Sequence, residues 1–282
     1  MDSTSLILTA MTVSAFVALR MYTLKRKRLW YLPRKIIFVR HGESLGNVEE
    51  TAYQDIPDWK IPLTERGIAQ AKSAGDIIRQ VTVGEKIVMY YSPYQRTTTT
   101  MEHVAEAIPF GDLLIIQEEP RIREQDFGNF QANNMVKFKL DRSRFGRFFY
   151  RFPNGESGAD VYDRVSSFLE SMYRTMMRIR LPHKQEYSIV IVSHGLTIRL
   201  FLMRWFRWTV EDFDKMSNPK NSVPIILERD DEGHYRLHPD SWKSLGVTEE
   251  TSPQVKWPLC MNRNGPGLNR HRSETATYSL QG

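Results

Sequence analysis

Two histidines in this chain stand at the ends of predicted buried strands. His41 and His194 each follow a short apolar, β-branched run, and each is followed by a glycine. Ligands of open parallel sheets bind beyond the carboxyl ends of the strands, so the two histidines could face each other across one crevice. A neutral imidazole can attack phosphorus, and a helix that begins at Gly195 would offer backbone N–H groups to an anion. The spacing therefore indicates chemistry on a phosphoryl group.

Two arginines accompany these histidines. Arg40 directly precedes His41, and Arg96 follows a predicted strand and a Ser-Pro turn. A planar guanidinium can donate two hydrogen bonds to one phosphate, so we predict that this pair binds the phosphoryl oxygens. Asn47, in the glycine-bearing loop after His41, is expected to donate one more hydrogen bond. The remaining histidines are interpreted as structural: His103, His183, His234, His238 and His271.

The elements that must position these residues alternate along the chain. Continuous apolar runs predict strands at 35–40, 86–91, 113–117, 188–193 and 223–229, each buried on both faces. Apolar residues at spacings of three and four predict a long helix over 159–179, and turn residues precede predicted helices at 64–81 and 94–107. The alternation predicts an α/β fold with three layers, in which helices cover both faces of a mostly parallel sheet.

The N-terminal segment differs from this ordered middle. Residues 3–19 are uncharged and mostly apolar, Arg20 could extend outward, and a basic cluster begins at Lys25. This predicts one transmembrane helix in a single-pass membrane protein whose catalytic domain faces the cytosol. The residues do not distinguish the mitochondrial outer membrane from the endoplasmic reticulum. A cleaved signal peptide is the alternative, but no basic leader precedes the apolar run.

The rest of the organisation follows from composition. We divide the chain into a membrane anchor with its basic juxtamembrane segment (1–33), a catalytic domain (34–245) and a partly disordered tail (246–282) rich in Pro, Asn, Ser and Thr. A net charge of +6 is spread along the 282 residues, which favours phosphorylated substrates or lipid over specific nucleic-acid binding. The single cysteine, Cys260, excludes an internal disulfide, and the oligomeric state is undetermined.

Four short motifs resemble those of the histidine phosphatase superfamily, in its phosphoglycerate-mutase-like branch (branch 1). They are Arg-His-Gly at 40–42 with Asn47, Leu-Thr-Glu-Arg-Gly at 63–67, Ser-Pro-Tyr-Gln-Arg-Thr at 92–97 and Ser-His-Gly at 193–195. The resemblance covers residues 34–237 and implies the histidine-phosphatase fold. It also implies a phosphohistidine on His41, a second catalytic histidine at His194, and phosphate binding by Arg40, Arg96 and Gly195. No metal and no cofactor is implied.

The resemblance also suggests the acid of the reaction. Residues 121–128 resemble the family's acid segment, in which a glutamate four residues before the glycine donates a proton; this selects Glu124 over Asp126. To donate a proton near neutral pH, Glu124 would need a raised carboxyl pKa. To stay neutral, His41 would need a lowered imidazole pKa. In the alternative interpretation both carboxylates pair with Arg121 or Arg123 on a loop.

The same residues in this family serve several functions. A phosphatase transfers the phosphoryl group to water and a mutase transfers it to another hydroxyl; the double-arginine lid segment typical of mutases is not found, which favours the phosphatase. The substrate could be a phosphorylated small molecule or, for a membrane-tethered protein phosphatase, a phosphoprotein. A binding protein that retains the phosphate pocket without turnover is a further alternative, but such a protein would have no reason to keep all five of these residues: Arg40, His41, Arg96, Glu124 and His194.

The insertion at 129–158 is basic and aromatic and resembles a lid. It could close over the pocket and select polyanionic substrates, or it could pack its aromatic residues on the core and leave a solvated basic face. Its basic residues are Lys137, Lys139, Arg142, Arg144, Arg147 and Arg151. Glu156, in the Gly-Glu-Ser segment at the end of this insertion, is interpreted as structural.

Overall fold

A computed structural model describes residues 11–17, 20, 31–49, 51–128, 135–182, 185–246 and 255–256. Within these residues the strands form one seven-stranded sheet in the order β3-β2-β4-β1-β5-β6-β7. The bounds are β1 Lys35–Arg40, β2 Lys86–Tyr91, β3 Leu113–Glu118, β4 Tyr187–Ser193, β5 Ile225–Arg229, β6 His234–Leu237 and β7 Val255–Lys256. The predicted α/β fold is confirmed, and every predicted strand is present.

The sheet is parallel in only one part. Strands β3, β2, β4 and β1 run parallel, whereas β5, β6 and β7 are antiparallel to their neighbours. All seven residues of the central strand β4 are buried, as its continuous apolar run predicts. The same prediction is wrong for β3, an edge strand with exposed Leu114 and Ile116, and for β5, whose burial alternates. A short apolar run does not tell the centre of a sheet from its edge.

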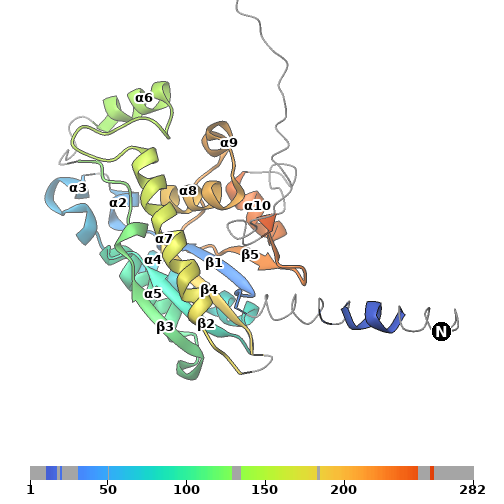
Figure 1. Ribbon diagram of the computed structural model, residues 1–282. Coiled ribbons are helices and arrows are strands. Elements are labelled where there is room, and N and C mark those ends of the chain that lie inside the picture. Colours follow the sequence, from blue (N-terminus) through green and yellow to red (C-terminus); the bar gives the residue numbers. More distant parts are fainter. Residues whose placement is uncertain are drawn as a thin grey trace, which may run out of the picture.

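Helices cover both faces of this sheet and make three layers (Figure 1). Helices α4 (Glu65–Val81) and α5 (Gln95–Glu106) pack on one face, over Ile37 and Val39. Helices α7 (Gly158–Arg178) and α8 (Gly195–Phe206) cover the other face, over Ile36 and Phe38. Successive side chains of β1 point to opposite faces of the sheet, so alternate residues of this strand belong to two separate hydrophobic cores. The three helices predicted from the sequence are confirmed to within one residue at each end.

Hydroxyl side chains set two of these helix starts. Thr64 caps α4 by accepting a hydrogen bond from the Gly67 N–H, and Ser157 caps α7 by accepting one from the Asp160 N–H. Each cap satisfies a backbone N–H that has no partner inside its helix.

Shorter elements follow the strands and helices. They are α2 Leu45–Val48, α3 Ala52–Asp55, η1 Asp58–Lys60, η2 Phe110–Asp112, η3 Pro120–Ile122, α6 Met135–Phe145, α9 Val210–Lys215 and α10 Pro239–Leu245. Figure 1 shows α2, α3, α6 and α9 toward the same end of the molecule, beyond the sheet.

The insertion at 129–158 contains helix α6, and its aromatic residues are divided between core and solvent. Phe148 and Phe152 are buried, whereas Phe145 and Phe149 are exposed. The prediction that the aromatic residues pack on the core is therefore correct for only part of the insertion. Residues 129–134 lie outside the described residues.

The two ends of the chain are described only in part. Residues 11–17 are helical, but most of the predicted anchor lies outside the described residues. Across the described ranges, no helix combines the length and the apolar character needed to cross a bilayer. At the other end, β7 falls in the segment predicted to be partly disordered and pairs with β6; apart from it and Gly246, that tail is outside the described residues.

Candidate active site

Two neighbouring strands bring the two histidines together. In the parallel pairing of β1 with β4, Arg40 lies opposite Ser193, and the His41 N–H donates to the Ser193 carbonyl at 3.0 Å. The rings of His41 and His194 then lie with centroids 5.3 Å apart, and the residues are 3% and 0% exposed. The parallel register of β1 and β4 therefore brings the two predicted histidines together.

His41 is held as a neutral imidazole. Its Nδ1 lies 2.7 Å from the Gly42 carbonyl oxygen, which can only accept, so Nδ1 carries the proton and Nε2 keeps its lone pair. Burial lowers the pKa of His41 well below its usual value, and the positive charges of Arg96 and Arg40 lower it further. The ring is thus in the form that can attack phosphorus.

His194 is also buried and neutral. Its Nε2 lies 2.8 Å from the Ser92 hydroxyl, and burial, followed by the charge of Arg96, lowers its pKa. Its Nδ1 lies 3.8 Å from a carboxylate oxygen of Glu124 and has no hydrogen-bond partner among the described residues. This nitrogen can therefore bind an oxygen of a ligand.

The two predicted arginines converge on the histidines from different elements. Arg96, in the first turn of α5, is 2% exposed and donates from Nη1 to the backbone carbonyl of Asp58 at 2.6 Å, with the Asp58 carboxylate 2.9 Å away. Arg40 donates from Nη1 to the Pro219 carbonyl at 3.0 Å, and its Nε has no partner in the described part of the chain. Burial lowers the pKa of Arg40, and Arg96 lowers it further. Such a concentration of positive charge attracts a phosphate.

Glu124 is the carboxyl group of this pocket. Burial raises its pKa, a smaller rise comes from Asp58, and the charges of Arg96 and Arg40 oppose it. Asp126 instead lies at the surface, where its carboxylate accepts a hydrogen bond from the Gly128 N–H at 2.7 Å. The geometry therefore favours Glu124 as the proton donor.

The alternative pairing of these carboxylates with the loop arginines is wrong. Arg121 pairs with Glu119 at 2.6 Å, and Arg123 pairs with Glu156 at 2.6 Å. Among the described residues, Glu124 has no arginine within ion-pair distance, and one of its carboxylate oxygens lies 3.8 Å from His194 Nδ1.

Asn47 and the glycines that follow the two histidines also make contacts within the protein. The Asn47 side-chain oxygen accepts hydrogen bonds from the Ser44 N–H and the Asn221 amide, so it fixes the loop. A Cβ on Gly42 would lie 2.4 Å from the Gly67 carbonyl oxygen, and one on Gly195 would lie 2.9 Å from the Asn218 side chain. Neighbouring protein atoms therefore require glycine at both positions. Phosphate binding by Asn47 and at Gly195 stays a prediction.

Some residues of the site were not predicted from the sequence. Burial raises the pKa of Tyr53, and the positive charges of Arg96 and Arg40 act on it in the opposite direction. The Asp58 carboxylate forms an ion pair with Arg96. The Asn221 amide donates a hydrogen bond to the His41 carbonyl at 2.8 Å. Tyr53 lies in α3, Asp58 begins η1 and Asn221 lies in a loop, and none of these segments carries a recognised motif, so no sequence signal identifies them. Among the described residues, no group of three or more His, Cys, Asp or Glu is arranged to hold a metal ion.

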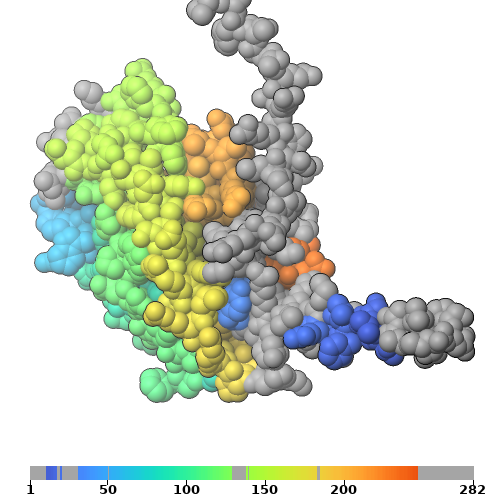
Figure 2. Space-filling model, in the orientation of Figure 1, coloured from blue at the N-terminus to red at the C-terminus, as the bar shows by residue number. Residues whose placement is uncertain are grey.

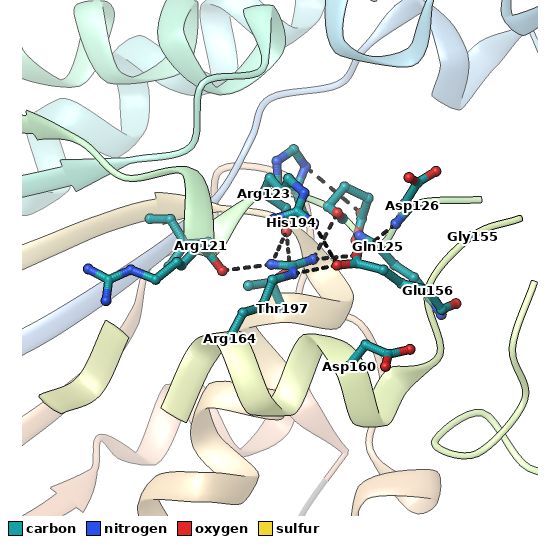
Figure 3. A network of polar contacts seen from close by, with 12 residues as sticks. Arg121, Arg123, Gln125, Asp126, Gly155, Glu156, Asp160, Arg164, His194 and Thr197 are labelled. Atoms are coloured by element: carbon teal, nitrogen blue, oxygen red, sulfur yellow. Dashed lines mark hydrogen bonds and ion pairs between the residues drawn. The ribbon is translucent and has the colours of Figure 1, made fainter. Parts of the chain in front are cut away.

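A partly buried ion pair holds the loop that carries Glu124. Arg164 on α7 donates to the backbone carbonyl oxygens of Arg121, Arg123 and Glu124 at 2.6, 2.9 and 2.9 Å. The same guanidinium pairs with the Glu156 carboxylate, which also accepts from the Asp126 N–H at 3.0 Å. Figure 3 shows this network between α7 and the loop 121–126. The interpretation of Glu156 as structural agrees with these contacts.

Substitution of Arg164 by lysine should reduce catalysis by misplacing Glu124. Lysine cannot make the forked set of bonds, and a displacement of about 1 Å can cost roughly 10²-fold in rate. We expect kcat on alkyl phosphates to fall by about that factor, with a smaller loss on aryl phosphates, which need no proton donor. Arg174→Lys, at an exposed position of the same helix, is the control. Equal losses on both ester classes would show that Arg164 does not act through Glu124.

Comparisons with known proteins agree with this geometry. A family model described as histidine phosphatase superfamily (branch 1) matches residues 36–240. The chain is 50% identical over 216 residues to phosphoglycerate mutase-like protein AT74H of Arabidopsis thaliana, covering 72% of this chain and 77% of that protein. It is 32% identical to the broad-range acid phosphatase DET1 of Saccharomyces cerevisiae, covering 71% and 86%. A solved mycobacterial glucosyl-3-phosphoglycerate phosphatase superposes with a TM-score of 0.57 at 18% identity, covering 76% and 100%, and so shares the fold.

Proposed function

Because this chain belongs to the histidine phosphatase superfamily (branch 1), we propose that it hydrolyses phosphate monoesters through a phosphohistidine on His41. One observation carries the proposal. A buried neutral histidine, with its Nδ1 proton bound to a carbonyl, shares a pocket with Glu124, a carboxyl group whose pKa is raised. These are the protonation states that a nucleophile and a general acid need at the same pH.

In the first half-reaction the phosphoryl oxygens bind to Arg40, Arg96 and the free Nδ1 of His194. The lone pair on His41 Nε2 attacks phosphorus while the bond from phosphorus to the ester oxygen breaks. Glu124 gives its proton to that departing oxygen, so the alcohol leaves neutral and a carboxylate remains. The arginines stabilise the charge of the transferring group, which is the main work of a phosphoryl-transfer site.

In the second half-reaction water takes the place of the alcohol. The Glu124 carboxylate accepts a proton from that water as its oxygen attacks phosphorus, and the bond to His41 Nε2 breaks. Inorganic phosphate leaves, His41 regains its lone pair, and Glu124 is again protonated. One carboxyl group therefore serves both half-reactions.

A mutase is the second candidate, because the Arabidopsis relative is named phosphoglycerate mutase-like. The yeast relative is named an acid phosphatase, and the absence from this sequence of the double-arginine segment typical of mutases favours hydrolysis. A membrane-tethered protein phosphatase would use the same pocket. A binding protein without turnover is disfavoured, because five residues with catalytic chemistry converge here: Arg40, His41, Arg96, Glu124 and His194.

The full-length chain in detergent should be assayed against alkyl and aryl phosphates and phosphopeptides, and against phosphoglycerate with and without bisphosphoglycerate. Release of inorganic phosphate is the expected result. Isomerised phosphoglycerate without released phosphate would replace the hydrolase by a mutase. Preference for phosphopeptides over every small ester would identify a protein phosphatase.

We further propose that residues 1–33 attach the catalytic domain to the cytosolic face of a membrane. The apolar run and the basic cluster after it support this proposal. The full chain should stay with membranes after carbonate extraction, and a variant lacking residues 1–33 should be released. Equal extraction of both proteins would contradict the anchor.

A further inference from the structure

The loop that connects α9 to β5, residues 216–224, lies beside the strand end that carries the nucleophile. Because β5 is antiparallel to β1, with Ile225 opposite Phe38, the loop that enters β5 lies at the carboxyl end of β1, just before His41. Figure 1 shows α9 toward the same end of the molecule as α2, and in Figure 2 the orange surface around α9 adjoins the yellow-green surface around α6. No step of the proposed reaction uses a residue of this loop.

Backbone groups of the loop hold Arg40. The Pro219 carbonyl accepts a hydrogen bond from Arg40 Nη1 at 3.0 Å, and the Ser222 N–H donates to the Arg40 carbonyl at 2.9 Å. Ser222 has a φ of 53°, in the left-handed region that serine rarely adopts, and its buried hydroxyl has no partner among the described residues. Such a backbone persists where its surroundings over-determine it, and it is common at functional sites.

The side chain of Asn221 bridges two parts of the site. Its Nδ2 donates to the His41 carbonyl at 2.8 Å and to the Asn47 side-chain oxygen at 3.3 Å. A carbonyl can only accept, so the group that faces His41 is the NH2 of the amide. The Asn47 atom also accepts from the Ser44 N–H, so it is the oxygen. One amide therefore ties the backbone of the nucleophile to helix α2.

The peptide group that follows His41 is held at both its ends. Its oxygen accepts from Asn221, and its nitrogen, the Gly42 N–H, donates to the Thr100 hydroxyl at 3.0 Å. The carbonyl of the same Gly42 accepts the Nδ1 proton of His41 at 2.7 Å. Rotation of the His41–Gly42 peptide would change the φ of Gly42 and move this carbonyl away from the ring. The contact that fixes the peptide thus also fixes the acceptor of the imidazole proton.

We propose that Asn221 is a positioning residue for the nucleophile. Its amide holds the His41–Gly42 peptide in the orientation in which Gly42 binds the Nδ1 proton, so that Nε2 keeps its lone pair and its direction toward phosphorus. Asn221 touches neither the substrate nor a reacting atom in this role. The inference rests on the proposed phosphatase function and adds a residue to it.

Two substitutions remove the amide: Asn221→Leu, which keeps the size of the side chain, and Asn221→Ala. We expect the rate constant for phosphoryl transfer to His41 to fall about 10- to 100-fold, because a displaced nucleophile slows attack on any ester. Single turnover of radiolabelled esters with the full-length chain in excess measures it, and alkyl and aryl phosphates should lose equally. Affinity for inorganic phosphate should change less than about threefold, because Arg40 and Arg96 keep their contacts. This rate constant does not depend on the fraction of folded protein.

The tautomer of His41 gives a readout that needs no turnover. Nuclear magnetic resonance of the full-length chain with 15N-labelled histidine, assigned by comparison with His41→Ala, should show the wild-type proton on Nδ1. In both Asn221 variants part of the His41 signal should show the proton on Nε2 instead. Lys220→Gln, at an exposed position of the same loop, is the control and should keep both the rate constant and the tautomer of the wild type.

Several results would overturn the inference. Wild-type rate constants or a wild-type tautomer in both Asn221 variants would remove the link to His41. A loss confined to alkyl esters would show that Asn221 acts through Glu124, and a parallel loss of phosphate affinity would show that it acts through the arginines. An equal loss in Lys220→Gln would exclude a specific role. If the wild-type chain forms no phosphohistidine, the proposed function itself fails, and the tautomer alone then decides whether Asn221 orients His41.

Discussion

Replacement of His41 by alanine is expected to lower kcat by at least about 10⁴-fold on every phosphate ester, because no other group in the pocket can take the phosphoryl. The neighbouring His194 cannot substitute, since its Nε2 is bound to Ser92 and its Nδ1 binds a phosphoryl oxygen in the proposed mechanism. Phosphate release from alkyl and aryl esters by the full-length chain measures the loss.

The chemical intermediate gives an independent readout. Brief incubation of wild-type protein with radiolabelled ester, followed by denaturation, should leave an acid-labile, base-stable phosphohistidine, and His41→Ala should show none. His103→Ala, at a histidine of α5 that pairs with Glu106, should retain both label and turnover. Label that persists in His41→Ala would move the nucleophile to another residue.

Glu124→Gln should separate the two half-reactions. For alkyl esters, whose alcohol leaves poorly without a proton, we expect kcat/KM to fall by about 10²–10⁴-fold. For 4-nitrophenyl phosphate, kcat/KM should change little, because that leaving group needs no acid. Its kcat should still fall, since hydrolysis of the phosphohistidine needs the Glu124 carboxylate as base.

The pH dependence follows from the direction of the pKa shifts. Glu124 must be protonated to act as the acid, and its raised pKa extends that form toward neutral pH; activity on alkyl esters is then lost as pH rises through this pKa. His41 must be neutral, and its lowered pKa keeps it so into the acid range. The wild-type chain should therefore work best on the acid side of neutrality, and Glu124→Gln should lack the alkaline decline.

Asp126→Asn is the matched control for this carboxylate. Asp126 lies two residues further along, in the same loop, but its side chain caps a turn at the surface. It should keep both the leaving-group dependence and the pH profile of the wild type. A profile altered in Asp126→Asn but not in Glu124→Gln would reverse the assignment.

Local interactions made much of this fold predictable. The period of apolar residues in α7 and the capping residues Thr64 and Ser157 are written in a few adjacent positions, so the helix bounds follow from the sequence. The same holds for His41 and His194, because each ends a continuous apolar run and the carboxyl ends of parallel strands meet at one edge of the sheet. Glu124 was selected by resemblance, and its place in the pocket agrees.

The wrong predictions concern distant neighbours. The apolar runs of β3 and β5 do not say which strands lie beside them, so their partial exposure and the antiparallel direction of β5 were missed. The packing contacts of Gly42 and Gly195 were also not predicted. Their missing side chains make room for Gly67 and Asn218, which only the packed chain brings there.

The sequence by itself therefore determined which groups of this protein can do chemistry, and at which strand ends they stand. Only the tertiary structure decided their charge states, because the pKa values of His41 and Glu124 depend on burial and on arginines from other elements. It also decided that Asp58 anchors Arg96 and that Arg142 approaches the residue beside Glu124. These contacts join segments far apart in the chain, and no local pattern encodes the distance between them.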